Sequence, residues 1–492
     1  MSVRGGASRR VTVVDCDVLV IGSGAGGSVA ARELAAAGRD VTVVEEGPRV
    51  TTAEIAARPP AENLRCLYRN GGLTPIFGKP MIAYGEGRCV GGTTVVNGGL
   101  LWAPPADLLD RWAAESGIGG YRAEHLTTHL DTIAGRLGAT MQTDGDGNRD
   151  SGLLADGADR LGWRWQYARR AIRGCRHSNR CTTGCPTGAK QSMAQTYLPD
   201  AEAFGARVVA DRRVTRMRHA GGLVREVHAV DHDGRRWAYR PRDVFLAAGP
   251  VNSAVLLQRS GIQRRSAAGR MAFHVNMRTI AEFSDRVDAT DGTIFTRQVH
   301  HFARDRVLIM PSNVTAGGLG AAVAAKPYAT AESLISGLDR IGVYTTQVAM
   351  SGTVRIHSGR LGVVLRHRMT AADHAGLRRA FASTARVLFA AGARRLHAPV
   401  PAAPPLSGVP EAEQVASAVA DGAWELISVH GMASCRMGRP ERGGVCDDRG
   451  RPYGMRNLRL CDASVLPGVT GISPQGAVMA FSHEIVSRFL AG

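Results

Sequence analysis

The apolar pattern at the start of the chain predicts a strand, a helix and a second strand. Residues 18–21 are an unbroken apolar run, which is typical of a parallel strand covered on both faces. Residues 28–37 are mostly small, helix-forming residues, and residues 40–44 contain a second short apolar run. The longer segment 11–21 contains two aspartates, so it lacks the unbroken apolar core of a secretory signal. We therefore interpret it as a first strand.

Further along, the pattern alternates between strands and helices. Short buried strands are predicted over residues 206–210 and 243–247. Period-two alternation predicts three more strands, at residues 278–283, 354–357 and 362–366. Residues 370–391 carry apolar positions at helical spacing, which predicts an amphipathic helix packed over that sheet. The mixture indicates an α/β fold.

The length of the chain indicates more than one domain. At 492 residues it exceeds the usual size of one hydrophobic core, so two domains are expected, and they need not be contiguous. Residues 106–169 are expected to be largely helical, and the Pro- and Ala-rich residues 398–410 to form a surface loop. No apolar run reaches the roughly 18 residues of a spanning helix. We expect a cytoplasmic protein.

The net charge of +18 favours two classes of partner, nucleic acids and anionic membrane surfaces. Nearly all of this charge is arginine, because lysine occurs only at Lys79, Lys190 and Lys326. The arginines are spread singly or in pairs without interleaved aromatic residues or a recognition motif, so we expect no nucleic-acid partner. Peripheral contact with a membrane surface stays open.

Three glycines, Gly22, Gly24 and Gly27, stand between the first predicted strand and the helix after it. In a dinucleotide-binding turn the first glycine permits the tight turn, the second lets a pyrophosphate approach, and the third lets helix and strand pack. The helix N-terminus offers unpaired N–H groups and a positive dipole end to the phosphates. Glu45, after the second strand, is placed to accept hydrogen bonds from an adenosine ribose. This segment predicts a dinucleotide site but does not separate FAD from NAD.

Four further motifs narrow the choice of dinucleotide. Residues 87–99 read Gly-Arg-Cys-Val-Gly-Gly-Thr-Thr-Val-Val-Asn-Gly-Gly, and residues 249–257 read Gly-Pro-Val-Asn-Ser-Ala-Val-Leu-Leu. Residues 430–438 begin His-Gly-Met, and residues 460–475 run from Leu-Cys-Asp-Ala-Ser to Ser-Pro-Gln. With the N-terminal glycines, this ordered set resembles the signatures of the glucose–methanol–choline (GMC) flavin oxidoreductases, nearest to their bacterial cholesterol oxidase and long-chain alcohol oxidase-like branch. One departure is Ala254, where the family usually has proline.

The resemblance implies how the two domains divide the chain. A Rossmann-like FAD-binding domain would be assembled from three separate segments, at residues 1–105, 170–265 and 428–492. A substrate-binding domain, an antiparallel sheet with helices, would comprise residues 106–169 and 266–427. The strands and the long helix predicted from periodicity in the second half of the chain agree with this division.

The resemblance also implies the cofactor contacts. These are Arg88, then Gly91, Gly92 and Asn97 along the flavin, Val214 at the adenine, and Asp462 and Ala463 at the pyrophosphate and ribityl chain. Pro474 and Gln475 would start a helix directed at the flavin pyrimidine ring, where a helix N-terminus stabilises the negative charge of the reduced ring. No histidine lies near the first signature, so we expect non-covalent FAD, with Cys89 as the one alternative attachment point.

His430 is the expected catalytic base. Alcohol oxidation needs a group that takes the hydroxyl proton while hydride leaves carbon for flavin N5, and histidine suits this because its usual pKa lies near working pH. Of fifteen histidines, His430 opens the motif that delivers the catalytic histidine in the family. The family's partner residue, commonly asparagine or histidine, is replaced here by Ser473. His483 lies about 15 Å further along the predicted helix, at 1.5 Å per residue, and is expected to be structural.

Three cysteines cluster at Cys175, Cys181 and Cys185, which is followed by proline. The spacing resembles the ferredoxin run C-x2-C-x2-C-x3-C-P, with Ser178 in place of one cysteine. A three-cysteine iron–sulfur or zinc site is the functional alternative. Because one ligand is missing and no second cluster motif is present, we expect no metal.

Two classes of reaction stay open. The first is oxidation of a CH–OH donor, a small-molecule alcohol of hydrophobic, sterol-like or secondary-metabolite type, with oxygen or another electron acceptor. The second is a lyase or isomerase reaction that retains FAD without net redox chemistry, which the replacement at Ser473 keeps open. Reduction of the bound flavin by substrate without air would separate them.

Overall fold

The N-terminal pattern forms the centre of a parallel sheet. The structure is a computed structural model, and it describes residues 11–264, 267–312, 319, 323, 326–359, 362–401 and 403–492. Strand β1 (Val11–Ile21) ends in four buried residues, as the apolar run predicts, and pairs in parallel with β2 (Val41–Val44). Helix α1 (Ala25–Ala36) connects them.

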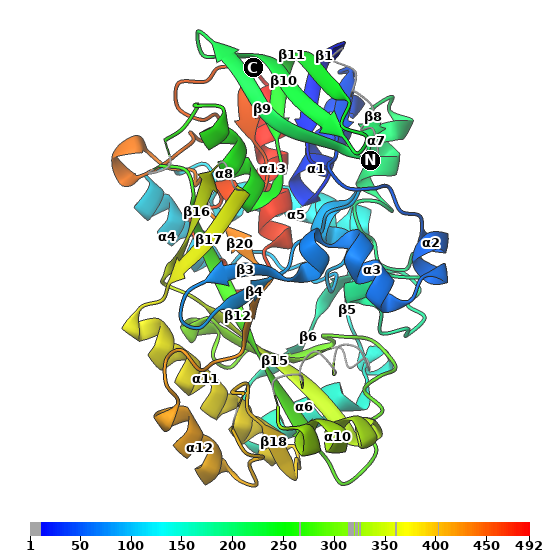
Figure 1. Cartoon of the computed structure of the whole chain (residues 1–492), viewed down its shortest axis with the longest axis vertical. Coiled ribbons are helices and arrows are strands. Elements are labelled where there is room, and N and C mark those ends of the chain that lie inside the picture. Colours follow the sequence, from blue (N-terminus) through cyan, green and yellow to red (C-terminus); the bar gives the residue numbers. More distant parts are fainter. Residues whose placement is uncertain are drawn as a thin grey trace, which may run out of the picture.

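This sheet has seven strands in the order β8-β2-β1-β11-β10-β9, with β21 paired to β11. The remaining members are β8 (Arg207–Val209), β9 (Arg212–Ala220), β10 (Leu223–Asp231), β11 (Arg236–Leu246) and β21 (Leu458–Leu460). The sheet lies at the top of Figure 1, where α1 packs against α7 (Tyr197–Ala203) and α13 (Gln475–Leu490). Gly26 is required at the contact of α1 with β21, because a Cβ there would lie 2.0 Å from the carbonyl oxygen of Cys461.

A second sheet has twelve strands, ten of them in the order β16-β17-β3-β4-β19-β12-β15-β14-β13-β6, and a third sheet pairs only β5 (Ala139–Met141) with β7 (Arg169–Ala171). The ten strands of the second sheet are β3 (Thr74–Phe77), β4 (Ile82–Tyr84), β6 (Trp165–Tyr167), β12 (Arg270–Glu282), β13 (Arg297–Val299), β14 (Val307–Pro311), β15 (Ile341–Ala349), β16 (Thr353–Gly359), β17 (Gly362–Arg368) and β19 (Leu426–Ser428). Two short strands, β18 (Arg395–His397) and β20 (Gly431–Met432), also pair with β12. The thirteen-residue β12 is thus the strand to which several distant segments attach.

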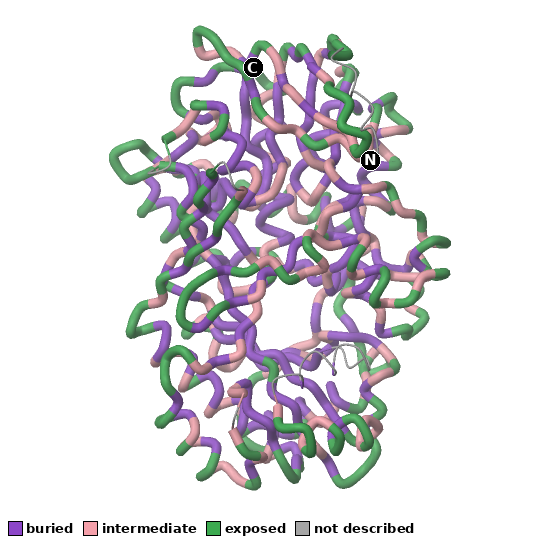
Figure 2. The backbone as a smooth tube through the Cα atoms, viewed as in Figure 1, coloured by how far each residue is buried: buried purple, intermediate pink, exposed green. Residues whose placement is uncertain are grey.

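Helices cover both sheets, and buried backbone runs through the strands (Figure 2). The longer ones are α4 (Ala106–Ser116), α5 (Ala123–Leu137), α6 (Arg149–Arg160), α8 (Gly249–Arg259), α11 (Ala371–Ala390) and α12 (Val409–Ala418), with shorter α2 (Thr52–Ala57), α3 (Pro60–Leu67) and α10 (Tyr328–Ser336). Helix α11 begins at a capping box between Thr370 and Asp373 and buries Leu377, Phe381 and Leu388 on one side. Figure 1 shows it with α12 at the end far from the parallel sheet.

The predicted α/β fold class is confirmed, and the strands and the long helix read from periodicity are present. The loop predicted over residues 398–410 contains no helix or strand among the described residues up to 408, but it ends two residues early because Val409 and Pro410 begin α12; residue 402 lies outside the described residues. Strands β3 and β4 fall within residues 1–105, yet they pair in the twelve-stranded sheet. The division of the chain into two domains at the stated boundaries stays a prediction.

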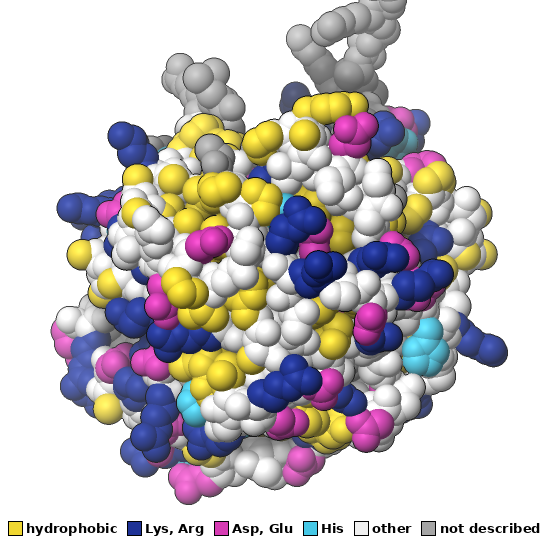
Figure 3. Space-filling model, turned by 90° about the horizontal axis from the view of Figure 1, so that it is seen from below, with side chains coloured by type: hydrophobic (Ala, Val, Ile, Leu, Met, Phe, Trp, Pro, Cys, Tyr) yellow, Lys and Arg dark blue, Asp and Glu magenta, His cyan; other side chains and the backbone are white. Residues whose placement is uncertain are grey.

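The surface carries its charge in small groups. On the face seen in Figure 3, Lys and Arg side chains of the described residues lie among acidic and apolar ones without forming a continuous basic surface. Within the described part of the chain, no helix is both long and apolar enough to cross a membrane.

Candidate active site

Most of the predicted site residues line one large cavity of about 1170 Å³. Those in its lining are Gly22, Gly24, Glu45, Gly92, Asn97, Val214, His430, Asp462, Ala463, Ser473, Pro474 and Gln475. Three others, Gly27, Arg88 and Gly91, are outside the lining. The cavity is bounded by both sheets, so it brings together segments from the whole length of the chain.

The glycine turn opens the cavity at the N-terminus of α1. Gly22 has φ +99°, and a Cβ there would lie 2.3 Å from the Ala247 carbonyl oxygen. Gly24 precedes α1, and a Cβ at this position would meet nothing within 4 Å, so the backbone borders open space. Gly27 faces inward, since its Cβ would lie 2.0 Å from the Gly22 carbonyl oxygen. These three positions provide the tight turn, the open backbone and the close packing that a pyrophosphate site needs.

Glu45 ties the end of β2 to the glycine turn. Its Oε2 accepts hydrogen bonds from the backbone N–H of Ser23 at 3.0 Å and from the Ser23 hydroxyl at 2.7 Å, and Oε1 accepts from Gly47 N–H at 2.8 Å. Burial raises the pKa of Glu45, and these hydrogen bonds oppose that rise. The backbone carbonyl of Glu45 accepts from Arg212 N–H at 2.7 Å, which joins β9, the strand that carries Val214, to the end of β2.

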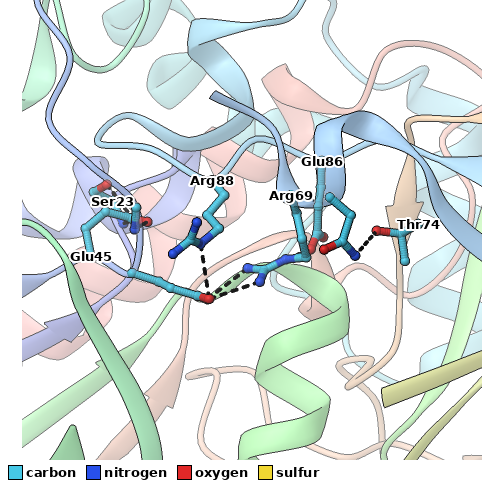
Figure 4. A network of polar contacts seen from close by, with 9 residues as sticks. Ser23, Glu45, Arg69, Thr74, Glu86 and Arg88 are labelled. Atoms are coloured by element: carbon cyan, nitrogen blue, oxygen red, sulfur yellow. Dashed lines mark hydrogen bonds and ion pairs between the residues drawn. The ribbon is translucent and has the colours of Figure 1, made fainter. Parts of the chain in front are cut away.

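A second carboxylate, Glu46, explains the position of Arg88. Arg69 and Arg88 form ion pairs with Glu46 at 2.9 and 3.3 Å, and Figure 4 shows the two arginines side by side with their guanidinium groups pointing the same way. Arg69 also pairs with Glu86 at 2.5 Å. Arg88 therefore holds the first signature against the end of β2 through Glu46, without itself lining the cavity.

The first signature and the C-terminal helix meet at the flavin end. Asn97 Nδ2 donates to Gln475 Oε1 at 2.6 Å across 378 residues of sequence, and Asn97 Oδ1 accepts from Gly99 N–H at 3.0 Å. Lys190 fixes the same loop, because its Nζ donates to the carbonyls of Val95 and Asn97 at 2.6 and 2.8 Å. Helix α13 begins here, with Pro474 and Gln475 at the cavity.

Asp462, in the fourth motif (residues 460–475), is hydrogen-bonded to the second motif (residues 249–257). Its buried carboxylate accepts from Gly249 N–H at 2.9 Å, from the Ser253 hydroxyl at 2.6 Å and from Ser464 N–H at 2.7 Å. Burial raises the pKa of Asp462, while the same hydrogen bonds stabilise its charged form. The neighbouring Ala463 lines the cavity and holds the segment that follows His430, because its carbonyl accepts from Ala433 N–H at 2.9 Å.

The lining residues fit FAD. The open backbone at Gly24 and the N-terminus of α1 suit the phosphates of FAD. The two buried carboxylates, Glu45 and Asp462, suit its hydroxyl groups. Gly92 allows the first signature to approach this turn, since a Cβ there would lie 2.8 Å from Gly24 Cα. Cys89 is buried outside the lining, and burial raises its pKa strongly, so its thiol is unsuited to a covalent bond with flavin.

His430 stands at the cavity between β19 and β20, held by the long strand β12. Its carbonyl accepts from His274 N–H at 3.2 Å, and the two rings are nearly perpendicular, at 77°, with their Nδ1 atoms 3.0 Å apart. Burial lowers the pKa of His430 to about 4. Burial, with the positive charges of His430 and Arg306, also lowers the pKa of His274. Both rings are therefore neutral near pH 7.

The hydrogen bonds determine which ring nitrogens carry protons. Gly471 N–H donates to His274 Nε2 at 3.2 Å, so the neutral ring of His274 carries its proton on Nδ1. That proton points at Nδ1 of His430, which must then accept. The neutral His430 consequently carries its own proton on Nε2. In this arrangement the Nε2–H of His430 can donate a hydrogen bond, and the ring must change tautomer before Nε2 can accept a proton.

Ser473 follows, by two residues, the Gly471 whose N–H contacts His274. It is buried, lines the cavity and precedes Pro474 at the start of α13. Its segment is fixed at Gly471, whose carbonyl accepts from Gln347 at 3.4 Å. His483 is outside the cavity lining and packs its ring 4.5 Å from that of His129, as expected for a structural residue.

The three clustered cysteines have separate partners. Cys175 contacts the Thr293 hydroxyl at 3.2 Å, Cys185 contacts that of Thr187 at 3.4 Å, and Cys181 accepts from Arg170 at 3.4 Å. Among the described residues, no group of three or more His, Cys, Asp or Glu side chains is arranged to hold a metal ion.

Sequence reasoning did not find the functional face of β12. His274, Asn276 and Arg278 alternate along this strand, and the last two line the cavity. Period-two alternation was the available signal, because residues two apart share one face of a strand. The alternation does not indicate which face of the strand borders the cavity, because that depends on the strands that pair with it.

Comparison with known proteins places these features in one family. Two family models described as GMC oxidoreductase match residues 64–276 and 349–482, and a model described as an NAD(P)-binding Rossmann-like domain matches residues 20–64. A GMC-type oxidoreductase of Mycobacterium tuberculosis is 34% identical over 98% of this chain and 76% of its own length. A long-chain-alcohol oxidase of Arabidopsis thaliana is 26% identical over 97% of this chain and 67% of its own length.

Solved structures share the fold at low sequence identity. Pyridoxine 4-oxidase from Mesorbium loti has a TM-score of 0.75 and 18% identity, covering 97% of this chain and 99% of its own. A formate oxidase of Aspergillus oryzae, studied for its FAD modification, has a TM-score of 0.75 and 14% identity, covering 98% and 99%. The chain therefore belongs to the GMC oxidoreductase family and is an FAD-dependent oxidoreductase.

Proposed function

We propose that the protein oxidises the CH–OH group of an alcohol, with FAD as the hydride acceptor at N5 and His430 as the group that takes the hydroxyl proton. The observation that carries this proposal is that His430 lines the same cavity as the FAD-binding glycines and the N-terminus of α13. A neutral histidine at this position is the acid–base group that the reaction needs. The names of relatives that act on long-chain alcohols support an alcohol donor.

The His274–His430 pair gives this proton transfer a specific requirement. The tautomer that Gly471 imposes leaves the proton of neutral His430 on Nε2. For His430 to take the alcohol proton, both rings must shift their protons, which brings the His274 Nε2–H against the Gly471 N–H. That step sacrifices one hydrogen bond, worth about 0.5–1.5 kcal/mol. Gly471 has φ +74°, so its peptide stands in a conformation that glycine adopts readily.

Ser473 and α13 are positioned to hold the reacting groups. The hydroxyl of Ser473 can donate one hydrogen bond or accept one, so it can orient the alcohol oxygen but is no base. The N-terminus of α13 carries a partial positive charge that favours negative charge on the reduced flavin ring. The substrate is an alcohol of hydrophobic, sterol-like or secondary-metabolite type, and the electrons then pass to oxygen or another acceptor.

Anaerobic flavin bleaching with a panel of alcohols tests the proposal. His430→Ala should retain FAD and lose substrate-driven bleaching by about 10²–10⁴-fold, the usual worth of a positioned acid–base group. His232→Ala is the matched control, since its side chain is 73% exposed and lies outside the cavity lining. Bleaching at the wild-type rate in His430→Ala would exclude His430 as the proton acceptor.

One observation favours a second candidate, a lyase or isomerase reaction that retains FAD without net redox chemistry. In the tautomer that the Gly471 hydrogen bond imposes, His430 offers Nε2–H as a donor, which suits polarisation of a substrate carbonyl rather than removal of a hydroxyl proton. Turnover of a substrate without any anaerobic bleaching of the flavin would select this candidate.

A further inference from the structure

One wall of the cavity carries a single charged side chain. Strands β12, β14 and β15 contribute Asn276, Arg278, Met310, Thr345 and Gln347 to the lining, and of these only Arg278 is charged. The carboxylates of the lining all come from the segments that hold FAD, at Glu45, Glu46, Glu86 and Asp462. The wall formed by the large sheet is thus neutral and mostly polar apart from one guanidinium.

Arg278 has no counter-ion in the protein. Every Asp and Glu of the chain falls within the described residues, and none of them forms an ion pair with Arg278 or acts on its charge. Its side chain is exposed where it lines the cavity, and desolvation by the surrounding protein lowers the pKa of the guanidinium. By contrast, the cavity-lining Arg69 and Arg212 pair with carboxylates at 2.5 and 2.9 Å. A guanidinium that lines the cavity without a counter-ion has its N–H donors available to an anion bound there.

The position of Arg278 relative to His430 is determined by one strand. His274, which holds His430, and Arg278 lie four residues apart on the same face of β12, so their Cα atoms are about 13 Å apart at roughly 3.3 Å per residue. Asn276 lies between them, paired with Gln347 across the sheet. Among the described residues its buried Oδ1 has no hydrogen-bond partner, so an acceptor is free midway along this face.

We infer that the substrate alcohol carries an anionic oxygen group, a carboxylate or a phosphate ester, which pairs with Arg278 while its carbinol lies at His430. The inference rests on the proposed alcohol oxidation and specifies its substrate class. A guanidinium forms two parallel hydrogen bonds to either group, and bonds of this kind are roughly twice as strong as neutral ones. The separation along β12 requires several carbon–carbon bonds between the anion and the carbinol.

The experiment compares matched anionic and neutral alcohols on the FAD-loaded protein. The anionic series runs from ω-hydroxybutyrate to ω-hydroxydodecanoate, each member is paired with the alkan-1-ol of the same carbon number, and a third series contains the monophosphate esters of the corresponding diols. Anaerobic flavin bleaching gives the rate and the dissociation constant of each compound. The carboxylate and phosphate series distinguish the two sources of the anion.

Arg278→Met should weaken the binding of the best anionic substrate by about ten- to hundredfold, which is the worth of a hydrogen bond to a charged group. It should leave the binding of the neutral alcohol of the same carbon number unchanged. Arg278→Lys keeps the charge without the fork and should recover part of the loss. Arg218→Met is the matched control, since Arg218 is exposed on β9 outside the cavity lining. Equal losses for anionic and neutral alcohols would overturn the inference and assign Arg278 to the flavin or to the fold.

A binding measurement separates this inference from the proposed reaction. Calorimetric titration of FAD-loaded His430→Ala with decanoate, and separately with decyl phosphate, measures anion binding without turnover. Binding that Arg278→Met abolishes supports the anion site even where no alcohol bleaches the flavin. Absence of binding by every carboxylate and phosphate overturns it, even where neutral alcohols are oxidised.

Discussion

Replacing His274 by phenylalanine tests how the proton on His430 is controlled. The change keeps a ring of similar size in a fully buried position and removes both hydrogen bonds of the imidazole. In the wild type, burial lowers the pKa of His430 to about 4. The Nδ1–H of His274 adds to this effect, because it occupies the lone pair where His430 would otherwise be protonated.

The size of the effect follows from that one hydrogen bond. A donor to neutral His430 stabilises the neutral form by about 0.5–1.5 kcal/mol, and one pKa unit corresponds to 1.36 kcal/mol. Removing the donor should therefore raise the pKa of His430 by about 0.4–1.1 units, toward its ordinary value. His430 must be neutral to take a proton, so the rate of flavin reduction should be constant above the pKa and fall as the pH falls through it. This acid limb should lie near pH 4 in the wild type and move toward 5 in His274→Phe.

Stopped-flow reduction of the flavin without air, after a jump from neutral stock to each pH, measures the limb before the protein unfolds. The jump is needed because the unfolded chain protonates its histidines near pH 6.5, while folded His274 and His430 stay neutral, so stability falls as the pH drops below that value. His274→Asn is the matched control, since its amide can still donate to His430 Nδ1, and its limb should stay near that of the wild type. A wild-type limb near 6.5, or a downward shift in His274→Phe, would refute the reasoning.

Other predictions follow from the same site. Ser473→Ala should reduce kcat/KM by the equivalent of about 0.5–1.5 kcal/mol, the worth of one hydrogen bond, whereas Ser473→Asn should be tolerated in an oxidase and should abolish the native reaction of a lyase or isomerase. Acid precipitation should release the flavin into the supernatant, and flavin in the pellet would show a covalent bond. Gly92→Ala should lose FAD retention, because the new Cβ would lie 2.8 Å from Gly24 Cα. Gly38→Ala is the control and should keep the flavin, because a Cβ at that position meets nothing within 4 Å. Both glycines have positive φ, so each substitution should lower the free energy of unfolding by about 1–2 kcal/mol.

Local signals were sufficient for the N-terminal strand, for the glycine turn after it and for the long helix α11. The buried run of β1, the glycines after it and the capped, amphipathic α11 each follow from residues close together in sequence. Short strands were harder, because three or four residues carry little periodicity. Strands β3 and β4 show the limit, since they stand within residues 1–105 and yet pair with β17 and β19 in the other sheet.

The candidate site shows the same division between local and distant information. Asn97 and Gln475 were both expected at the flavin, but no local pattern indicates that they bond to each other across 378 residues. His274 was missed because it sits in an apolar strand as one of fifteen histidines, and only the fold brings it within 3.0 Å of His430. Its role arises from pairing of β12 with the segment around β20, which no motif records.

Strand β12 therefore fixes the distance between the two places where the ends of the proposed substrate would bind. Antiparallel pairing of β12 with β15 over nine residues holds it rigidly, so the faces of His274 and Arg278 cannot slide relative to each other. An alcohol bound by its anion at Arg278 then reaches His430 only when its chain spans this interval. Shorter chains leave the carbinol away from the ring, and longer ones must fold within the cavity at an entropic cost. The rate of flavin bleaching across the ω-hydroxyalkanoate series should accordingly have a single optimum, and that optimum should disappear in Arg278→Met, because a substrate without its anchor has no fixed register on the strand.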